Sequence, residues 1–157
     1  MSEYINFDIE SFDIVDEPVD SQFSIAKIQA FSSGENRHDM VCSEELLQKS
    51  APTIYNKPIL YTIDKNFQDF NTHVEPENTL IAGFVEPNSA EFIRLQDGRL
   101  SLNVIARLWK RYAPKFMSIL KRDSGNKKVS VEMELKDSEK RRDGLVEMKE
   151  FVYMGIC

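Results

Sequence analysis

Cysteine and histidine are both scarce in this sequence, and long apolar runs are absent from it. The 157 residues include only two cysteines and two histidines, which are Cys42, Cys157, His38 and His73. Two cysteines form no disulfide framework, and their spacing fits no zinc motif. Two histidines are also too few for a multi-histidine metal site. We therefore expect the protein to hold neither a metal ion nor another cofactor.

The sequence also has little that indicates a membrane or a nucleic-acid partner. No apolar run approaches the ~20 residues that a membrane-spanning helix needs, and the first residues do not resemble a secretory signal. The net charge is −6 and the pI is about 5.0, without a dominant basic stripe. The hydrophobic content of 41% is typical of a globular protein. We expect one soluble, intracellular domain with no nucleic-acid or membrane partner.

Residues 1–20 contain seven acidic residues but no lysine or arginine. Acidic runs of this kind are usually solvated arms or interaction tails. Apolar residues are interleaved with the acids, so part of the segment could pair as an edge strand or dock on a basic partner. These residues are Tyr4, Ile5, Phe7, Ile9, Phe12 and Ile14. We predict a semi-ordered acidic arm over residues 1–20 and a folded domain over residues 21–157.

Period-two patterns and turn signals in the folded domain predict six to eight strands, many of them antiparallel, with two helices over them. Strands are expected within residues 22–31, 58–63, 79–85, 92–95, 100–104, 127–135 and 146–156. Asp97-Gly98 and Asp143-Gly144 predict hairpin turns. One helix should follow the N-cap Ser43, and another should begin at Pro114. The chain ends inside an apolar strand at Cys157, which we interpret as a truncated or processed product.

Ser130 lies in the most regular of these strands. Apolar residues fall on one face of the stretch and polar residues on the other, which predicts a half-buried strand with Ser130 on its polar face. A serine hydroxyl becomes a useful nucleophile when a neighbouring base takes its proton, and imidazole titrates in the right range. The base would be His38, in a turn, or His73, in the long polar loop over residues 64–78. The alternative is that Ser130 is an ordinary exposed strand serine.

Other chemistries have weaker support in the sequence. The G-x-S-x-G motif of α/β-hydrolases is absent. Cys42 precedes a helix start, which favours a thiolate, but the acidic residues Glu44 and Glu45 oppose this effect. Glu132 and Glu134 could form the carboxylate pair of a glycosidase, yet a solvated strand face explains them more simply.

Several short motifs keep a characteristic order and spacing from about Ile28 to Ile156. They are FSSGENR at 31–37, SEELL at 43–47, NKPI at 56–59, GFVEP at 83–87, VSVE at 129–132 and KEFVYMGI at 149–156. Together they resemble the prohead (capsid maturation) serine proteases of tailed phages, which share the herpesvirus assemblin fold. The resemblance implies an α+β fold with a small, mostly antiparallel β-barrel flanked by helices, and it makes residues 21–157 a protease domain.

The resemblance also implies two catalytic residues. The nucleophile falls on Ser130 and the general base on His73. His38 matches only the turn and helix entry of the family pattern and is not favoured. Assemblins use a second histidine on the strand after the serine strand. This chain has none there, so an acidic residue is expected in that role.

Two acidic residues are candidates for this third role, and the sequence leaves the choice open. Glu150 interrupts the apolar register of its strand, but a tight Asp143-Gly144 turn would place it opposite Asp137, with Ser130 opposite Cys157. That displacement along the strand is too long for a direct triad. Glu132 shares the predicted face of Ser130. An acid beyond Cys157 is the remaining alternative.

The function implied by the resemblance is that of a serine endopeptidase. It would cleave phage scaffold and major capsid proteins inside the assembling prohead, in the host cytoplasm. Because assemblins dimerise, self-association is a further expectation. The rival hypothesis is a non-catalytic capsid-assembly or scaffold domain with the same fold.

Overall fold

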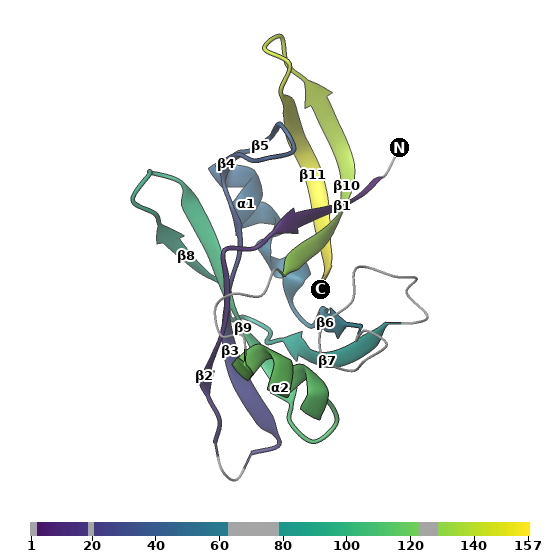
Figure 1. The fold of residues 1–157 in the computed structure, drawn as a ribbon. Coiled ribbons are helices and arrows are strands. Elements are labelled where there is room, and N and C mark those ends of the chain that lie inside the picture. The colour runs from purple at the N-terminus through teal and green to yellow at the C-terminus, as the bar shows by residue number, and fades with distance from the viewer. Residues whose placement is uncertain (1–2, 19–20, 63–78, 123–128) are drawn as a thin grey trace.

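The computed structural model describes residues 3–18, 21–62, 79–122 and 129–157. Within these residues, eleven strands form one curled sheet, accompanied by two short α-helices (Figure 1). The strands are β1 (Glu3–Asp8), β2 (Ser11–Asp16), β3 (Phe23–Ser32), β4 (Gly34–Glu35), β5 (Met40–Cys42), β6 (Pro58–Tyr61), β7 (Leu80–Val85), β8 (Glu91–Arg94), β9 (Leu100–Trp109), β10 (Ser130–Lys140) and β11 (Val146–Ile156). The helices are α1 (Glu44–Ser50), the 3₁₀ turn η1 (Ala51–Ile54) and α2 (Pro114–Arg122).

The sheet has a mixed topology. Its main path runs β1-β10-β11-β6-β7-β9-β3-β2, while β4 pairs with β5 and β8 pairs with β9. Most neighbouring strands are antiparallel, but β11 pairs in parallel with both β5 and β6. The prediction of a mostly β fold with flanking helices is confirmed. The sheet is a curled half-barrel. Its topology is mixed because the segment that follows the Asn36 turn runs parallel to the last strand, β11.

The acidic arm contributes both ends of this sheet. β1 pairs with β10, and β2 pairs with β3. Between them, the N–H groups of Ile9 and Glu10 donate to the carbonyls of Val129 at 2.8 Å and Gln29 at 3.3 Å. One nearly continuous extended segment over residues 3–16 therefore connects the two outer ends of the half-barrel. These residues of the arm therefore pair as strands, which was one of the two possibilities that their apolar residues suggested.

Local sequence signals set several element boundaries as predicted. Ser43 caps α1, where its Oγ accepts from the backbone N–H of Leu46 at 3.1 Å. Pro114 is the first residue of α2. Gly98 and Gly144 adopt φ angles of 92° and 91° in the two hairpin turns, a conformation that suits glycine. None of the described helices is long and apolar enough to cross a membrane.

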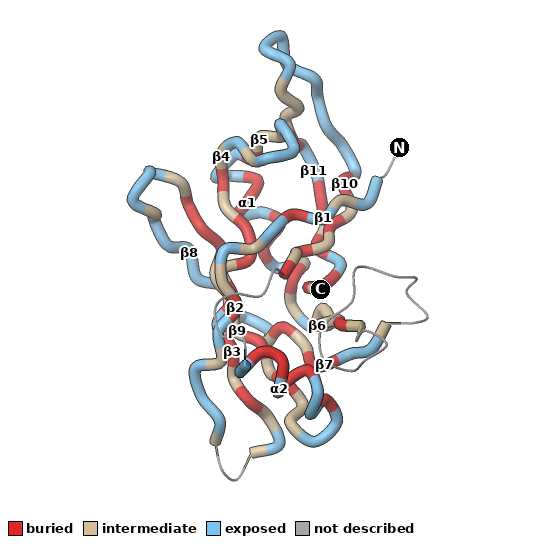
Figure 2. The backbone as a smooth tube through the Cα atoms, viewed as in Figure 1, coloured by how far each residue is buried: buried red, intermediate tan, exposed pale blue. Residues whose placement is uncertain are grey.

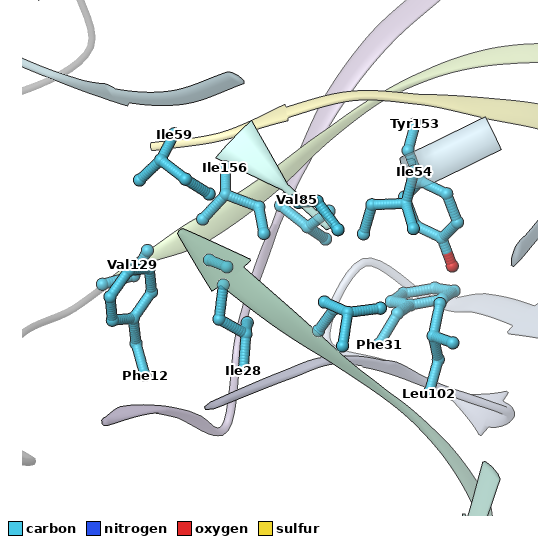
Figure 3. Close-up of a cluster of buried hydrophobic side chains, with 14 of the residues drawn as sticks. Phe12, Ile28, Phe31, Ile54, Ile59, Val85, Leu102, Val129, Tyr153 and Ile156 are labelled. Carbon is cyan, nitrogen blue, oxygen red and sulfur yellow. The ribbon is translucent and has the colours of Figure 1, made fainter. Parts of the chain in front are cut away.

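The hydrophobic core lies inside the curl of the sheet. Figure 3 shows Phe12 of β2, Ile28 and Phe31 of β3 and Tyr153 of β11 within one cluster of buried side chains. Both helices bury apolar residues against the sheet, including Leu47 of α1 and Phe116 of α2. Figure 2 shows that the far ends of the β10–β11 and β8–β9 hairpins are exposed. The core therefore fixes the start of β10, where the candidate site lies.

Candidate active site

Ser130 is the first residue of β10, and the alternation predicted around it is confirmed. Val131 and Met133 are fully buried, whereas Ser130 and Glu132 are partly exposed on the opposite face. The backbone of Ser130 is hydrogen-bonded to Cys157, the residue that follows β11. Its N–H donates to the carbonyl of Cys157, and its carbonyl accepts from the N–H of Cys157, both at 2.8 Å. Ser130 therefore lies on a strand that is hydrogen-bonded at this point, on the face opposite the buried Val131 and Met133.

Asp8 lies directly across from Ser130 on the other neighbouring strand. The antiparallel register of β1 and β10 makes Asp8 and Ser130 Cα partners, and the next pair on this face is Asn6 with Glu132. Directly opposite residues in an antiparallel pair project from the same face of the sheet. The structure therefore brings a carboxylate from the acidic arm next to the candidate nucleophile.

An open groove of about 880 Å³ runs past these two residues. Its walls come from the β1–β2 connection, the end of β3 and the turn over residues 35–38. Ser130, Asp8 and His38 are all among the lining residues. Ser130 therefore lines a groove that is open to solvent, as a nucleophile must be if its substrate is a peptide.

The turn that carries His38 is ordered by the side chain of Asn36. Its Oδ1 accepts from the backbone N–H of His38 at 3.0 Å and from that of Met40 at 3.3 Å. Asp39 takes a positive φ of 57°, which an aspartate tolerates in a tight turn. The sequence segment GENRHD thus forms a compact turn at the rim of the groove.

Two contacts hold this turn against β1. The Arg37 guanidinium forms an ion pair with the Asp8 carboxylate at 3.4 Å. The His38 ring meets the Phe7 ring edge-on, with a centroid distance of 4.9 Å and an interplanar angle of 82°. The turn and the arm therefore form one wall of the groove, although they are far from Ser130 in sequence.

The other sequence-predicted site residues fall in different places. His73 belongs to residues 63–78, outside the described residues. Glu132 stays on the face of Ser130, and its charge helps raise the pKa of the nearby Cys157 thiol. Glu150 is exposed and pairs with Asp137, as the hairpin register predicted. The structure thus brings Glu132, but not Glu150, close to Ser130.

The two thiols are poor candidates for a nucleophile. Burial raises the pKa of Cys42 to about 12. Burial, with a smaller effect from the charge of Glu132, raises the pKa of Cys157 to about 11. A thiol is nucleophilic as the thiolate, so both are almost unreactive near neutral pH. Among the residues that the structure describes, no group of three or more His, Cys, Asp or Glu residues is placed to hold a metal ion.

Sequence reasoning did not place Asp8 in the site. Ile5, Phe7 and Ile9 alternate with Asn6 and Asp8, a pattern that indicates a strand with Asp8 on its polar face. Its partner strand was not evident, because pairing of the arm with β10 joins segments more than 120 residues apart in the chain.

Comparison with known proteins yields a family and a fold. A family model described as the YonD N-terminal domain matches residues 22–157. No curated protein matches the sequence. Among solved structures, the capsid assembly protease gp21 of bacteriophage T4 matches with a TM-score of 0.63 and 10% sequence identity, over 98% of this chain and 94% of that chain. The fold implied by the resemblance to phage prohead proteases is therefore confirmed at the level of overall architecture.

Proposed function

Since the chain belongs to the YonD N-terminal domain family and shares the fold of a phage capsid assembly protease, we propose that it is a serine endopeptidase of prohead maturation. Its substrates would be the scaffold and major capsid proteins of a phage. It would act inside the assembling prohead in the host cytoplasm. The observation that carries the proposal is the position of Ser130 on the polar face of β10, in the lining of an open groove.

The proposed reaction is acyl transfer in two steps. The imidazole of His73 takes the proton from the Ser130 hydroxyl as Oγ attacks the scissile carbonyl carbon. The C–N bond then breaks, and the same imidazole gives its proton to the leaving amine. In the second step, water attacks the acyl-enzyme, its proton passes to His73, and Ser130 is released with the hydroxyl restored.

The two acids expected from the sequence differ in how well their positions suit this mechanism. Glu132 lies two residues from Ser130 on the same face of β10. Glu150 pairs with Asp137, seven residues further along the strand. At about 3.3 Å per residue, that offset exceeds 20 Å, which is beyond the span of a hydrogen-bonded triad. Glu132 is therefore the better supported of the two.

The rival function is that of a non-catalytic capsid-assembly domain. It would use the same half-barrel as a scaffold or interaction module, and the groove would then bind a peptide without cleaving it. The two functions differ in whether the Ser130 hydroxyl is required for a covalent step.

Co-expression with the scaffold and major capsid proteins of the cognate phage tests the proposal, with intact masses as the readout. Wild-type protein should produce discrete cleavages. Ser130→Ala and His73→Ala should each reduce them by about 10³-fold or more, because the nucleophile and the base act as one unit. Ser138→Ala is the matched control, since Ser138 is an exposed serine on the same strand.

Two outcomes would contradict the proposal. Cleavage that survives Ser130→Ala, in variants that remain folded, would remove Ser130 as the nucleophile. The absence of cleavage by the wild type, with stable binding of the scaffold protein, would favour the assembly-domain function. His38→Ala belongs in the same experiment because His38 lines the groove with Ser130. Loss of cleavage in this variant, with His73→Ala active, would move the base to His38.

A further inference from the structure

Charge is distributed unevenly along this acidic chain. Residues 98–122 contain seven lysine and arginine residues and no aspartate or glutamate, although the net charge of the chain is −6. The segment comprises β9, a short turn and α2. Figure 1 shows this turn at the lower end of the molecule and the tip of the β10–β11 hairpin at the upper end. None of the residues of the turn lines the groove that contains Ser130, so the turn is a separate part of the surface.

The acidic arm already neutralises part of this basic segment. The Glu17 carboxylate forms an ion pair with the Lys121 ammonium at 2.7 Å. The Lys110 ammonium donates a hydrogen bond to the Pro18 carbonyl at 2.8 Å. Within the molecule, the segment therefore binds an acidic stretch of chain through carboxylate and carbonyl oxygens.

Two other basic residues of the segment have no such partner. Arg111 and Lys115 are exposed, and neither forms an ion pair with any residue that the structure describes. Tyr112 lies between them in the sequence and is 70% exposed, with the Arg111 guanidinium 6.0 Å from the centre of its ring. We call Arg111, Tyr112 and Lys115 the basic patch. Exposed tyrosine and arginine side chains are enriched where proteins bind one another.

Backbone hydrogen bonds order the turn that carries the basic patch. The N–H of Ala113 donates to the carbonyl of Trp109 at 3.0 Å, and the N–H of Met117 donates to the carbonyl of Ala113 at 3.1 Å. The half-buried Trp109 ring packs against the Phe23 ring at a centroid distance of 4.3 Å, which leaves apolar surface at the start of the turn. A patch on an ordered turn loses little conformational freedom when it binds a partner.

We propose that the basic patch is a docking site for an acidic segment of the scaffold protein. The identity of this partner rests on the proposed function, and docking would capture the substrate at a surface separate from Ser130. Carboxylates of the segment pair with Arg111 and Lys115, and an apolar residue of the segment covers Tyr112. Charge complementarity favours this partner, because an acidic segment is repelled by the net negative charge of the chain and attracted only where basic residues lack partners.

Other anionic partners fit the basic patch less well. A nucleic acid presents a continuous row of phosphates, which the acidic arm beside Lys121 would repel. The arm of a second copy is also acidic, but its residues 3–16 are already paired with β10 and β3 of their own sheet.

The test measures binding of the purified scaffold protein to Ser130→Ala, so that cleavage does not interfere. On this background, Arg111→Glu/Lys115→Glu should weaken binding by about tenfold or more, because two attractions become two repulsions. Lys136→Glu/Arg142→Glu is the matched control, since it makes the same charge change at two exposed residues of the distant β10–β11 hairpin. Its binding should stay within about twofold of the parent. Tyr112→Ala should weaken binding by about fivefold or more.

Two further measurements separate docking from a general defect. Binding through the basic patch should weaken as salt is added, and this dependence should be smaller in Arg111→Glu/Lys115→Glu. The rate at which a fluorophosphonate labels Ser130 should be unchanged by the same double substitution, because the patch lies outside the groove.

The outcomes distinguish this inference from the function on which it rests. If the scaffold protein does not bind, or if both double variants bind it equally well, the docking site is wrong. If double-stranded DNA binds the basic patch and the scaffold protein does not, the partner is a nucleic acid. Self-association that Arg111→Glu/Lys115→Glu abolishes, with scaffold binding unchanged, would make the partner a second copy. If the scaffold protein docks on the patch but the wild type neither cleaves it nor reacts with the fluorophosphonate, the proposed endopeptidase function fails and the docking site stands.

Discussion

Ser130 and Cys157 exchange both of their backbone hydrogen bonds, each 2.8 Å long. This reciprocal pair joins the start of β10 to the residue that follows β11. On its other edge, β10 pairs with β1 at the same position. Three segments that are distant in sequence therefore meet at Ser130. Backbone pairing therefore sets the position of the candidate nucleophile, and Ser130 lines the groove.

The neighbourhood of Ser130 can be probed through the Cys157 thiol. Burial and the charge of Glu132 raise its pKa to about 11, so we expect very slow alkylation by iodoacetamide at pH 8. The rate should rise roughly tenfold per pH unit up to about pH 11. Glu132→Gln removes a negative charge that opposes the thiolate, so it should lower the pKa and accelerate alkylation at pH 8. Peptide mapping by mass spectrometry reads the rate, and fast wild-type alkylation at pH 8 would contradict this description.

The arm should contribute substantially to stability, because Phe7 is buried and packs against Phe31 with a ring-centroid distance of 5.1 Å. Phe7→Ala should reduce the free energy of unfolding by about 3–5 kcal/mol. Tyr4→Ala on the same strand is the control, since Tyr4 is 74% exposed, and its effect should be within about 0.5 kcal/mol. Urea unfolding measures both, and equal effects would mean that β1 is not docked as described.

Gly83 lies where two strands approach closely. A Cβ atom at this position would be 1.9 Å from the carbonyl oxygen of Arg107 on β9. Gly83→Ala should therefore push β7 from β9 and cost about 3 kcal/mol or more. Gly98→Ala is the comparison, because a Cβ there meets nothing within 4 Å and only the φ of 92° is strained, at about 1–2 kcal/mol. Thermal unfolding that ranks Gly98→Ala as the worse variant would contradict the close approach.

The register around the site agrees with the one expected from a single turn. The Asp143-Gly144 signal predicted Ser130 opposite Cys157 and Glu150 opposite Asp137, and both pairs are present. Next to the turn, however, Lys140 pairs with Val146 and Glu139 with Glu147, one residue away from the predicted register. Register shifts restore the predicted pairing at Asp137 and again from Glu132 to the site, so the agreement there depends on these irregularities as well as on the turn.

Pairings between distant segments were not predictable in this way. The parallel neighbours of β11 and the pairing of β1 with β10 depend on packing that no local pattern specifies. The alternation in the arm indicated a strand, but it could not indicate that Asp8 would face Ser130. The groove was missed for the same reason, since its walls come from the arm, β3 and the Asn36 turn.

The most direct test of Ser130 as a nucleophile is to map the site of a fluorophosphonate adduct on the folded protein by peptide mass spectrometry. A serine made nucleophilic by a neighbouring base reacts with this reagent, whereas an ordinary surface serine does not. We predict one adduct, on Ser130, that is absent from Ser130→Ala and retained in Ser138→Ala. An adduct on another residue, or none on a folded protein that binds its scaffold partner, would contradict the claim that Ser130 is a catalytic nucleophile.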